Sequence, residues 1–151
     1  MKHLFWAMAL LLCVGCGGSD GSDDVYQLGD YYNRNGNKGV VFEISNGGRN
    51  GKILSLDEKM RCKWSDAKQW CRDHGDGWRL PTVGELEAIY RNKRDINYWL
   101  TRCKGIELGG GYYWSSAEYN SGRAWLVYMY DGYTFSITKS NRSYVRAVSA
   151  F

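Results

Sequence analysis

Apolar residues follow two different periods along the chain, and the change of period divides it into strands, helices and strands. β-branched and aromatic residues fill 40–44, and a second such run at 52–56 follows an Asn- and Gly-rich turn, which is typical of a β-hairpin. Segments with helical spacing come next, and an alternating pattern returns near residue 112 and continues to residue 151. This order predicts an α+β fold whose final strand pairs near the first hairpin.

The predicted elements have the following details. Ser65 is expected to cap the first helix, with Trp64 on its inner face, and His74 is expected to end it as a partner of the helix dipole, with catalysis as the alternative. Residues 25–38 are expected to form an irregular lead-in. The helices are predicted at 66–73, 83–93 and 95–102, and the later strands at 112–116, 124–129, 133–138 and 144–151.

The chain's only proline, Pro81, marks a corner between the first two predicted helices. Proline holds the residue before it in an extended conformation, and Thr82 then has the position of a helix N-cap because Glu85 falls three residues later. Alternation along the extended part places Trp78 and Arg79 on opposite sides. We expect the segment to be architectural, with a ligand-facing role for Arg79 as the alternative. The residues expected to be structural are Trp78, Arg79, Pro81, Glu85 and Trp114.

The hairpin formed by the strands at 124–129 and 133–138 can be registered in two ways. A two-residue turn would place Tyr130 opposite Tyr133, whereas a three-residue turn with a left-handed Gly132 would place Met129 there. We expect the three-residue turn, because it gathers the apolar residues on one face. That predicted face holds Trp125, Val127, Met129, Tyr133, Phe135 and Ile137.

The N-terminus has the features of a lipoprotein signal. An apolar run from Leu4 to Val14 is too short to span a membrane, and a small residue precedes Cys16. We expect residues 1–15 to be a signal peptide, Cys16 to be lipidated, 16–38 to be the tether and lead-in, and 39–151 to be the domain. An ordinary secretory signal is the alternative. The acids that follow Cys16 resemble the export signals of surface lipoproteins of the Bacteroidetes group.

Charge and cysteine content exclude several classes of function. The net charge of +4 is scattered, and the densest cluster, Arg91 to Arg94, lies at a predicted helix end, so no nucleic-acid partner is expected. Beyond the tether no C-x-x-C is present, and the chain has only two histidines, so neither a metal nor a cofactor is expected. Beyond the tether, Cys62, Cys71 and Cys103 allow three pairings, of which the two with Cys103 are favoured.

The sequence gives little support for catalysis and more support for ligand binding. Four carboxylates, Asp66, Asp73, Glu85 and Glu118, show no spacing that indicates an acid–base pair, so the protein is not expected to be an enzyme. The chain is rich in tyrosine, with 12 residues. The candidate ligand-binding residues are Tyr112, Tyr119, Tyr128 and Tyr130 as exposed stacking platforms, with Arg123 as their polar neighbour; ordinary sheet decoration is the alternative.

An ordered set of motifs carries a resemblance to a known family. It comprises W-x-x-A-x-x-x-C from Trp64 to Cys71, W-R-L-P-T-x-x-E-L from Trp78 to Leu86, Y-W-S-S at 113–116, A-W-x-V at 124–127 and V-R-A-V at 145–148. Together they resemble the Lcl C-terminal domain family, over about residues 40–151.

The resemblance implies a C-type-lectin-like fold, with two main helices packed on a curled antiparallel sheet. It also implies a bacterial surface protein, since some members are linked to adhesion to glycosaminoglycans. Family members often carry Cys where Ala147 stands, where it could pair with the position of Cys71. Calcium-binding lectin motifs are absent, because the only proline is Pro81, and no cysteine pair of the formylglycine-generating enzymes follows Cys103.

These observations predict a non-catalytic, adhesin-like binding module. We expect it to be held on the outer membrane by the lipid on Cys16, to face the cell exterior, and to bind an extracellular glycan or a surface protein. The alternative is a structural subunit of an envelope or fimbria-like assembly.

Overall fold

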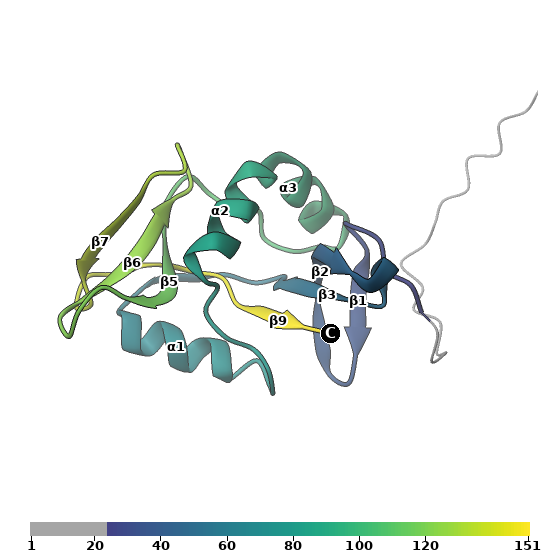
Figure 1. Cartoon of the computed structure of the whole chain (residues 1–151), viewed down its shortest axis with the longest axis horizontal. Coiled ribbons are helices and arrows are strands. Elements are labelled where there is room, and N and C mark those ends of the chain that lie inside the picture. Colours follow the sequence, from purple (N-terminus) through teal and green to yellow (C-terminus); the bar gives the residue numbers. More distant parts are fainter. Residues whose placement is uncertain (1–23) are drawn as a thin grey trace, which may run out of the picture.

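The computed structural model describes residues 24–151. These residues form two sheets and three α-helices (Figure 1). The predicted signal peptide and Cys16 lie outside the described residues, and no helix within 24–151 is long and apolar enough to cross a membrane.

The first sheet joins the start of the described chain to its end. Its strand order is β1-β2-β3-β9, and all of its neighbouring strands are antiparallel. A short 3-10 helix, η1 (Asn46–Gly48), makes the turn of the first hairpin. The strands are β1 (Tyr31–Arg34), β2 (Asn37–Ser45), β3 (Asn50–Ser55) and β9 (Val148–Ala150).

The second sheet has the order β4-β8-β5-β6-β7. Its neighbours are antiparallel except β5 and β8, which run parallel where Tyr113 lies opposite Tyr144. The edge strands of this sheet are therefore β4 and β7. The strands are β4 (Lys59–Cys62), β5 (Tyr112–Glu118), β6 (Arg123–Tyr128), β7 (Thr134–Thr138) and β8 (Ser143–Val145).

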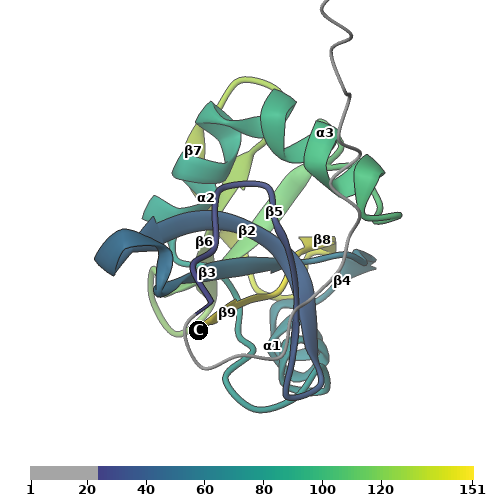
Figure 2. The ribbon, with the colours of Figure 1, turned by 90° about the vertical axis from the view of Figure 1, so that its right-hand side faces the viewer.

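Three helices cover the sheets from two sides. Helix α1 (Trp64–Arg72) lies on one side, whereas α2 (Val83–Arg91) and α3 (Lys93–Arg102) lie together on the other, as both views show (Figures 1 and 2). Two buried clusters fill the layers between. The first contains Trp64, Trp78 and Trp114, and the second contains Leu86, Ile96 and Leu100.

The predicted α+β class is confirmed, and so is the pairing of the final strand with the first hairpin, through β3 and β9. The single curled sheet is replaced by two sheets. The last predicted strand, 144–151, is broken into β8 and β9, and these belong to different sheets. Residues 25–38 were expected to be irregular but contain β1 and the start of β2, and β4 was not predicted.

The first helix begins at Trp64, two residues before the start at Asp66 that a Ser65 cap predicted. Lys63 holds the N-cap position without a side-chain hydrogen bond. The amide of Trp64 instead donates to the carbonyl of Lys139 at 3.1 Å, and the Trp64 side chain is buried in the first cluster. A tertiary contact has therefore replaced the local cap.

The predicted register of the β6–β7 hairpin was wrong. Tyr128, rather than Met129, faces Tyr133, and its amide donates to the Tyr133 carbonyl at 2.8 Å. The loop is four residues long because Met129 is drawn into the second cluster. Leu126 and Val127 are both fully buried, so both faces of the hairpin carry apolar residues and alternation does not determine the register.

The left-handed Gly132 was predicted correctly. Its φ is +80°, and a Cβ there would lie 2.3 Å from Cε1 of Tyr90. Gly84, inside α2, has open space around its Cβ position and no positive φ. A methyl group would therefore clash at position 132 but would fit at position 84.

We expect Gly132→Ala to lower the free energy of unfolding by about 1–3 kcal/mol, because it adds backbone strain and a clash. Its matched control, Gly84→Ala, should raise that free energy by up to about 1 kcal/mol, because alanine favours a helix interior. Urea unfolding of both variants measures the difference. Equal effects would contradict the tight Gly132–Tyr90 approach.

Candidate binding surface

The corner around Pro81 is fixed by a charged network built on the predicted capping box. Thr82 and Glu85 form the expected capping box, with hydrogen bonds of 3.1 and 2.8 Å. The guanidinium of Arg79 donates to both oxygens of Glu85, at 2.8 and 2.7 Å, and Lys52 lies 3.1 Å from the same carboxylate. Arg79 therefore has an architectural role.

The corner is also attached to the first sheet. The backbone of Arg79 exchanges two hydrogen bonds with Val148 of β9, at 3.0 and 2.9 Å. Trp78 is buried and donates its indole N–H to Oδ1 of Asn37 at 2.8 Å. Trp114, also predicted to be structural, is buried and donates to the carbonyl of Cys62 at 2.9 Å.

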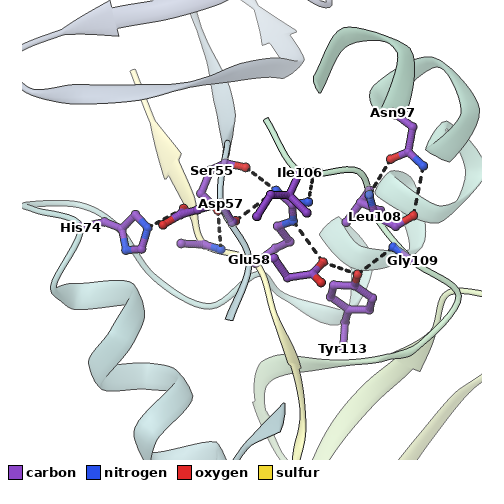
Figure 3. Close-up of polar contacts among 11 residues, drawn as sticks. Ser55, Asp57, Glu58, His74, Asn97, Ile106, Leu108, Gly109 and Tyr113 are labelled. Carbon is purple, nitrogen blue, oxygen red and sulfur yellow. Dashed lines mark hydrogen bonds and ion pairs between the residues drawn. The ribbon is translucent and has the colours of Figure 1, made fainter. Parts of the chain in front are cut away.

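Arg146 is fully buried where the chain passes from β8 to β9. Its guanidinium donates to the carbonyls of Ser55 and Asp57 at 2.8 and 3.0 Å, and also to the carbonyl of Ile106. Its Nε lies 3.5 Å from the carboxylate of Glu58. One side chain therefore joins the β3–β4 connection, the glycine-rich loop at 105–111 and the break between the sheets (Figure 3).

The carboxylate of Glu58 extends this buried polar cluster to β5. It accepts a hydrogen bond from the hydroxyl of Tyr113, which in turn accepts one from the amide of Gly109 at 3.1 Å (Figure 3). Burial, reinforced by Glu58, raises the pKa of Tyr113, so its hydroxyl stays a neutral donor. Burial lowers the pKa of Arg146, and the neighbouring Glu58 opposes that effect.

Asn97 of α3 fixes the far part of the same loop. Its side chain donates to the carbonyl of Leu108 at 3.0 Å and accepts from the amide of Leu108 at 2.7 Å (Figure 3). Leu108 is buried in the second cluster. The glycine-rich loop is therefore held near its start, at Ile106, and at its middle, at Leu108.

His74 makes the contacts of a helix-terminal link. Its Nδ1 lies 3.0 Å from the carbonyl of Trp70, and its Nε2 lies 2.8 Å from Asp57. Both partners accept hydrogen bonds, which matches the predicted role at the end of α1.

The cysteines fall into different parts of the core. Cys62 and Cys71 belong to the first cluster, whereas Cys103 packs against the second. The two favoured pairings with Cys103 are therefore not supported. Burial raises the pKa of Cys71 to about 12, and Ala147 lies in the same cluster.

Three of the candidate tyrosines come together at one end of the second sheet. The rings of Tyr112 and Tyr128 stack at 4.3 Å, and Tyr130 lies 5.8 Å from Tyr128. Because Tyr128 faces Tyr133 and Leu126 faces Phe135, the corrected register adds two aromatic residues to this row. We call the set the tyrosine patch: Tyr112, Tyr128, Tyr130, Tyr133 and Phe135.

The patch is open to solvent and carries little charge. Tyr130 is 75% exposed, Tyr133 67% and Tyr112 43%. Desolvation, together with Tyr112 and Asp131, raises the pKa of Tyr128, so its hydroxyl is neutral at physiological pH. The Asp131 carboxylate accepts a hydrogen bond from the amide of Tyr133 at 2.9 Å. The rings are therefore presented as neutral stacking faces.

The other two candidates lie elsewhere. Arg123 and Trp125 point to the opposite face of β6 from Tyr128, because side chains alternate along a strand. Tyr119 contacts Trp125, with ring centroids 5.2 Å apart. The guanidinium of Arg123 donates to the hydroxyl and carbonyl of Ser136 on β7. Tyr119 is exposed, as expected, but neither Tyr119 nor Arg123 is part of the patch.

Sequence reasoning missed Tyr133 and Phe135 because it assigned them to the wrong face of the hairpin. The adjacent apolar residues Leu126 and Val127 could have indicated a strand that is covered on both sides, and both are buried. Across residues 24–151, no group of three His, Cys, Asp or Glu side chains could hold a metal ion.

Comparison with known proteins gives the class of the chain. The Lcl C-terminal domain family matches residues 34–149, and the chain belongs to this family. No curated protein matches it. Among solved structures, the crystal structure of botrocetin is similar, with 13% identity, 79% of this chain and 94% of that chain covered, and a TM-score of 0.45.

The corner network makes a testable contribution to stability. Burial opposes ionisation of Glu85, but hydrogen bonds from Arg79 and Thr82 outweigh it and lower its pKa to about 2. A carboxyl with a depressed pKa stabilises the fold above its unfolded pKa and loses that effect as the pH falls through the folded value.

We therefore expect Glu85→Gln to lose on the order of 2 kcal/mol of unfolding free energy at pH 7. The difference from wild type should shrink as the pH falls from about 4.5 to about 2. Urea unfolding at a series of pH values measures it. A pH-independent difference would show that the charge of Glu85 contributes nothing.

Proposed function

We propose that the protein is a surface-exposed, lipid-anchored binding module of the adhesin type. Its ligand is an extracellular glycan or a surface protein that stacks on the tyrosine patch. In this proposal the domain is non-catalytic, uses no cofactor and has a C-type-lectin-like layout, with terminal strand pairing, two-sided helices and a second sheet that carries the binding surface.

The exposed tyrosine patch is the observation that supports this function best. Aromatic side chains bury about 150–250 Å² each when covered, and contiguous exposed apolar patches mark interaction sites. Tyr130 and Tyr133 are the two most exposed large hydrophobic side chains of the described residues. Their hydroxyls add hydrogen-bonding groups at the rim of the rings, which suits a ligand with both apolar faces and polar edges.

The position of the patch also suits a tethered protein. The described chain begins beside β1, and β7 lies at the other end of the long axis (Figure 1). A lipid on Cys16 would hold the protein by the β1 end, away from the patch.

The loop at 105–111 supports the proposal in a second way. Tyr112 follows the glycine-rich loop that Arg146 and Asn97 hold, and the amide of Met129 donates to the carbonyl of Gly111 at 2.9 Å. The stacking rings are therefore attached to a rigid base, which reduces the entropy lost when a ligand binds.

Assembly by strand addition is less favoured. The edge strand β7 is covered in part by Arg123, whose guanidinium bonds the outward carbonyl of Ser136. Protected edges of this kind oppose pairing with another chain.

We expect Tyr130→Ala combined with Tyr133→Ala to weaken ligand binding by at least about tenfold, since exposed aromatic anchors dominate interfaces. The unfolding free energy should change by less than about 0.5 kcal/mol for each substitution. The measurement is a glycan array, and capture from host surface proteins, with the domain at 24–151.

Tyr119→Ala is the matched control, because it removes an exposed tyrosine outside the patch and should leave binding unchanged. Binding that survives loss of Tyr130 and Tyr133 would remove the patch from the proposal.

A further inference from the structure

A second surface feature lies on the edge of the sheet opposite the tyrosine patch. β4 is one edge strand of the five-stranded sheet and β7 is the other. The β4 edge carries a row of exposed cations around an exposed methionine. We call this set the basic edge: Lys59, Met60, Arg61, Lys63 and Arg142.

The cations of the basic edge are not neutralised by the protein. Within residues 24–151, none of Lys59, Arg61, Lys63 and Arg142 has a carboxylate within ion-pair distance. Of the nearby acids, Asp57 contacts His74 and Glu58 faces Arg146 in the core, whereas Asp66 at the start of α1 lies near Cys62. The four cations of the edge therefore outnumber the acids around them and leave a net positive field.

The backbone of β4 does not offer a regular edge for another strand. Arg61 has a φ of +47°, and the register with β8 shifts between Lys59 and Cys62. The guanidinium of Arg142 donates to the carbonyl of Arg61 at 3.4 Å. A partner is therefore contacted through side chains rather than by strand addition.

Met60 distinguishes between the possible anionic partners. It is 64% exposed, and cationic residues lie on both sides of it in the chain. A soluble polyanion would gain nothing from a bare thioether, whereas an apolar side chain among cations can enter the headgroup region of a bilayer.

We propose that the basic edge lies on an anionic lipid surface, with Met60 in the headgroup region and the cations against lipid phosphates. The inference adds an orientation to the proposed function and rests on its lipid anchor, which would keep the edge close to the membrane. The tyrosine patch lies on β5 to β7 and their loop rather than on this edge, so the proposal does not use the patch for membrane contact.

The test uses the processed chain, residues 16–151, with Cys16→Ser so that no lipid assists binding. Co-sedimentation is measured with phosphatidylcholine vesicles, with and without phosphatidylglycerol. We expect binding only to the anionic vesicles, weakened by salt. Arg61→Gln with Arg142→Gln should weaken it about 25-fold, at about fivefold for each cation removed.

Arg91→Gln with Arg94→Gln is the charge-matched control, because both residues are exposed near the junction of α2 and α3. It should change binding far less than the edge variant, whereas Met60→Ser should weaken binding without changing the charge.

Three results would overturn the proposal: equal binding to neutral and anionic vesicles, equal losses in the edge variant and the control, or binding to soluble polyphosphate without binding to vesicles. Tyr130→Ala should leave vesicle binding unchanged. Failure of the basic edge is therefore distinguishable from failure of the tyrosine patch.

Discussion

The fold depends most on the buried guanidinium of Arg146. A buried charge is costly unless its donors and its countercharge are provided for. Here three backbone carbonyls accept hydrogen bonds from its terminal nitrogens, and the Glu58 carboxylate supplies the countercharge 3.5 Å from Nε, which makes no hydrogen bond within residues 24–151. These groups come from the β3–β4 connection and the glycine-rich loop. The contacts fall where the chain leaves one sheet and enters the other. One side chain therefore joins segments that are far apart in the sequence.

This arrangement connects the core to the exposed rings. The loop held by Arg146 leads directly into β5, and Tyr112 at the start of β5 stacks on Tyr128. Tyr113, the next residue, points inward to Glu58. Adjacent residues of one strand thus serve the buried polar cluster and the proposed binding surface, because side chains alternate across a strand. Packing around Arg146 is therefore connected to the position of the tyrosine patch through the loop and β5.

Much of the fold and of the candidate site could be predicted from the sequence, but only where the interacting residues are close together in the chain. The capping box at Thr82 and the burial of Trp78 follow from neighbouring residues and were confirmed. The register at Tyr133 was wrong because the β6–β7 hairpin is covered on both faces, so its alternation is ambiguous. The role of Arg146 could not be predicted, because its partners lie 40 to 91 residues away.

The central claim is that Arg146 holds the loop at 105–111 to the two sheets, and hydrogen exchange of that loop in Arg146→Met tests it most directly. We expect exchange of the loop amides to accelerate and the unfolding free energy to fall by about 3–5 kcal/mol, because Glu58 loses its buried partner. Arg123→Met, which removes an exposed arginine that also bonds a carbonyl, should leave the loop protected. Equal protection of residues 105–111 in both variants would contradict the account.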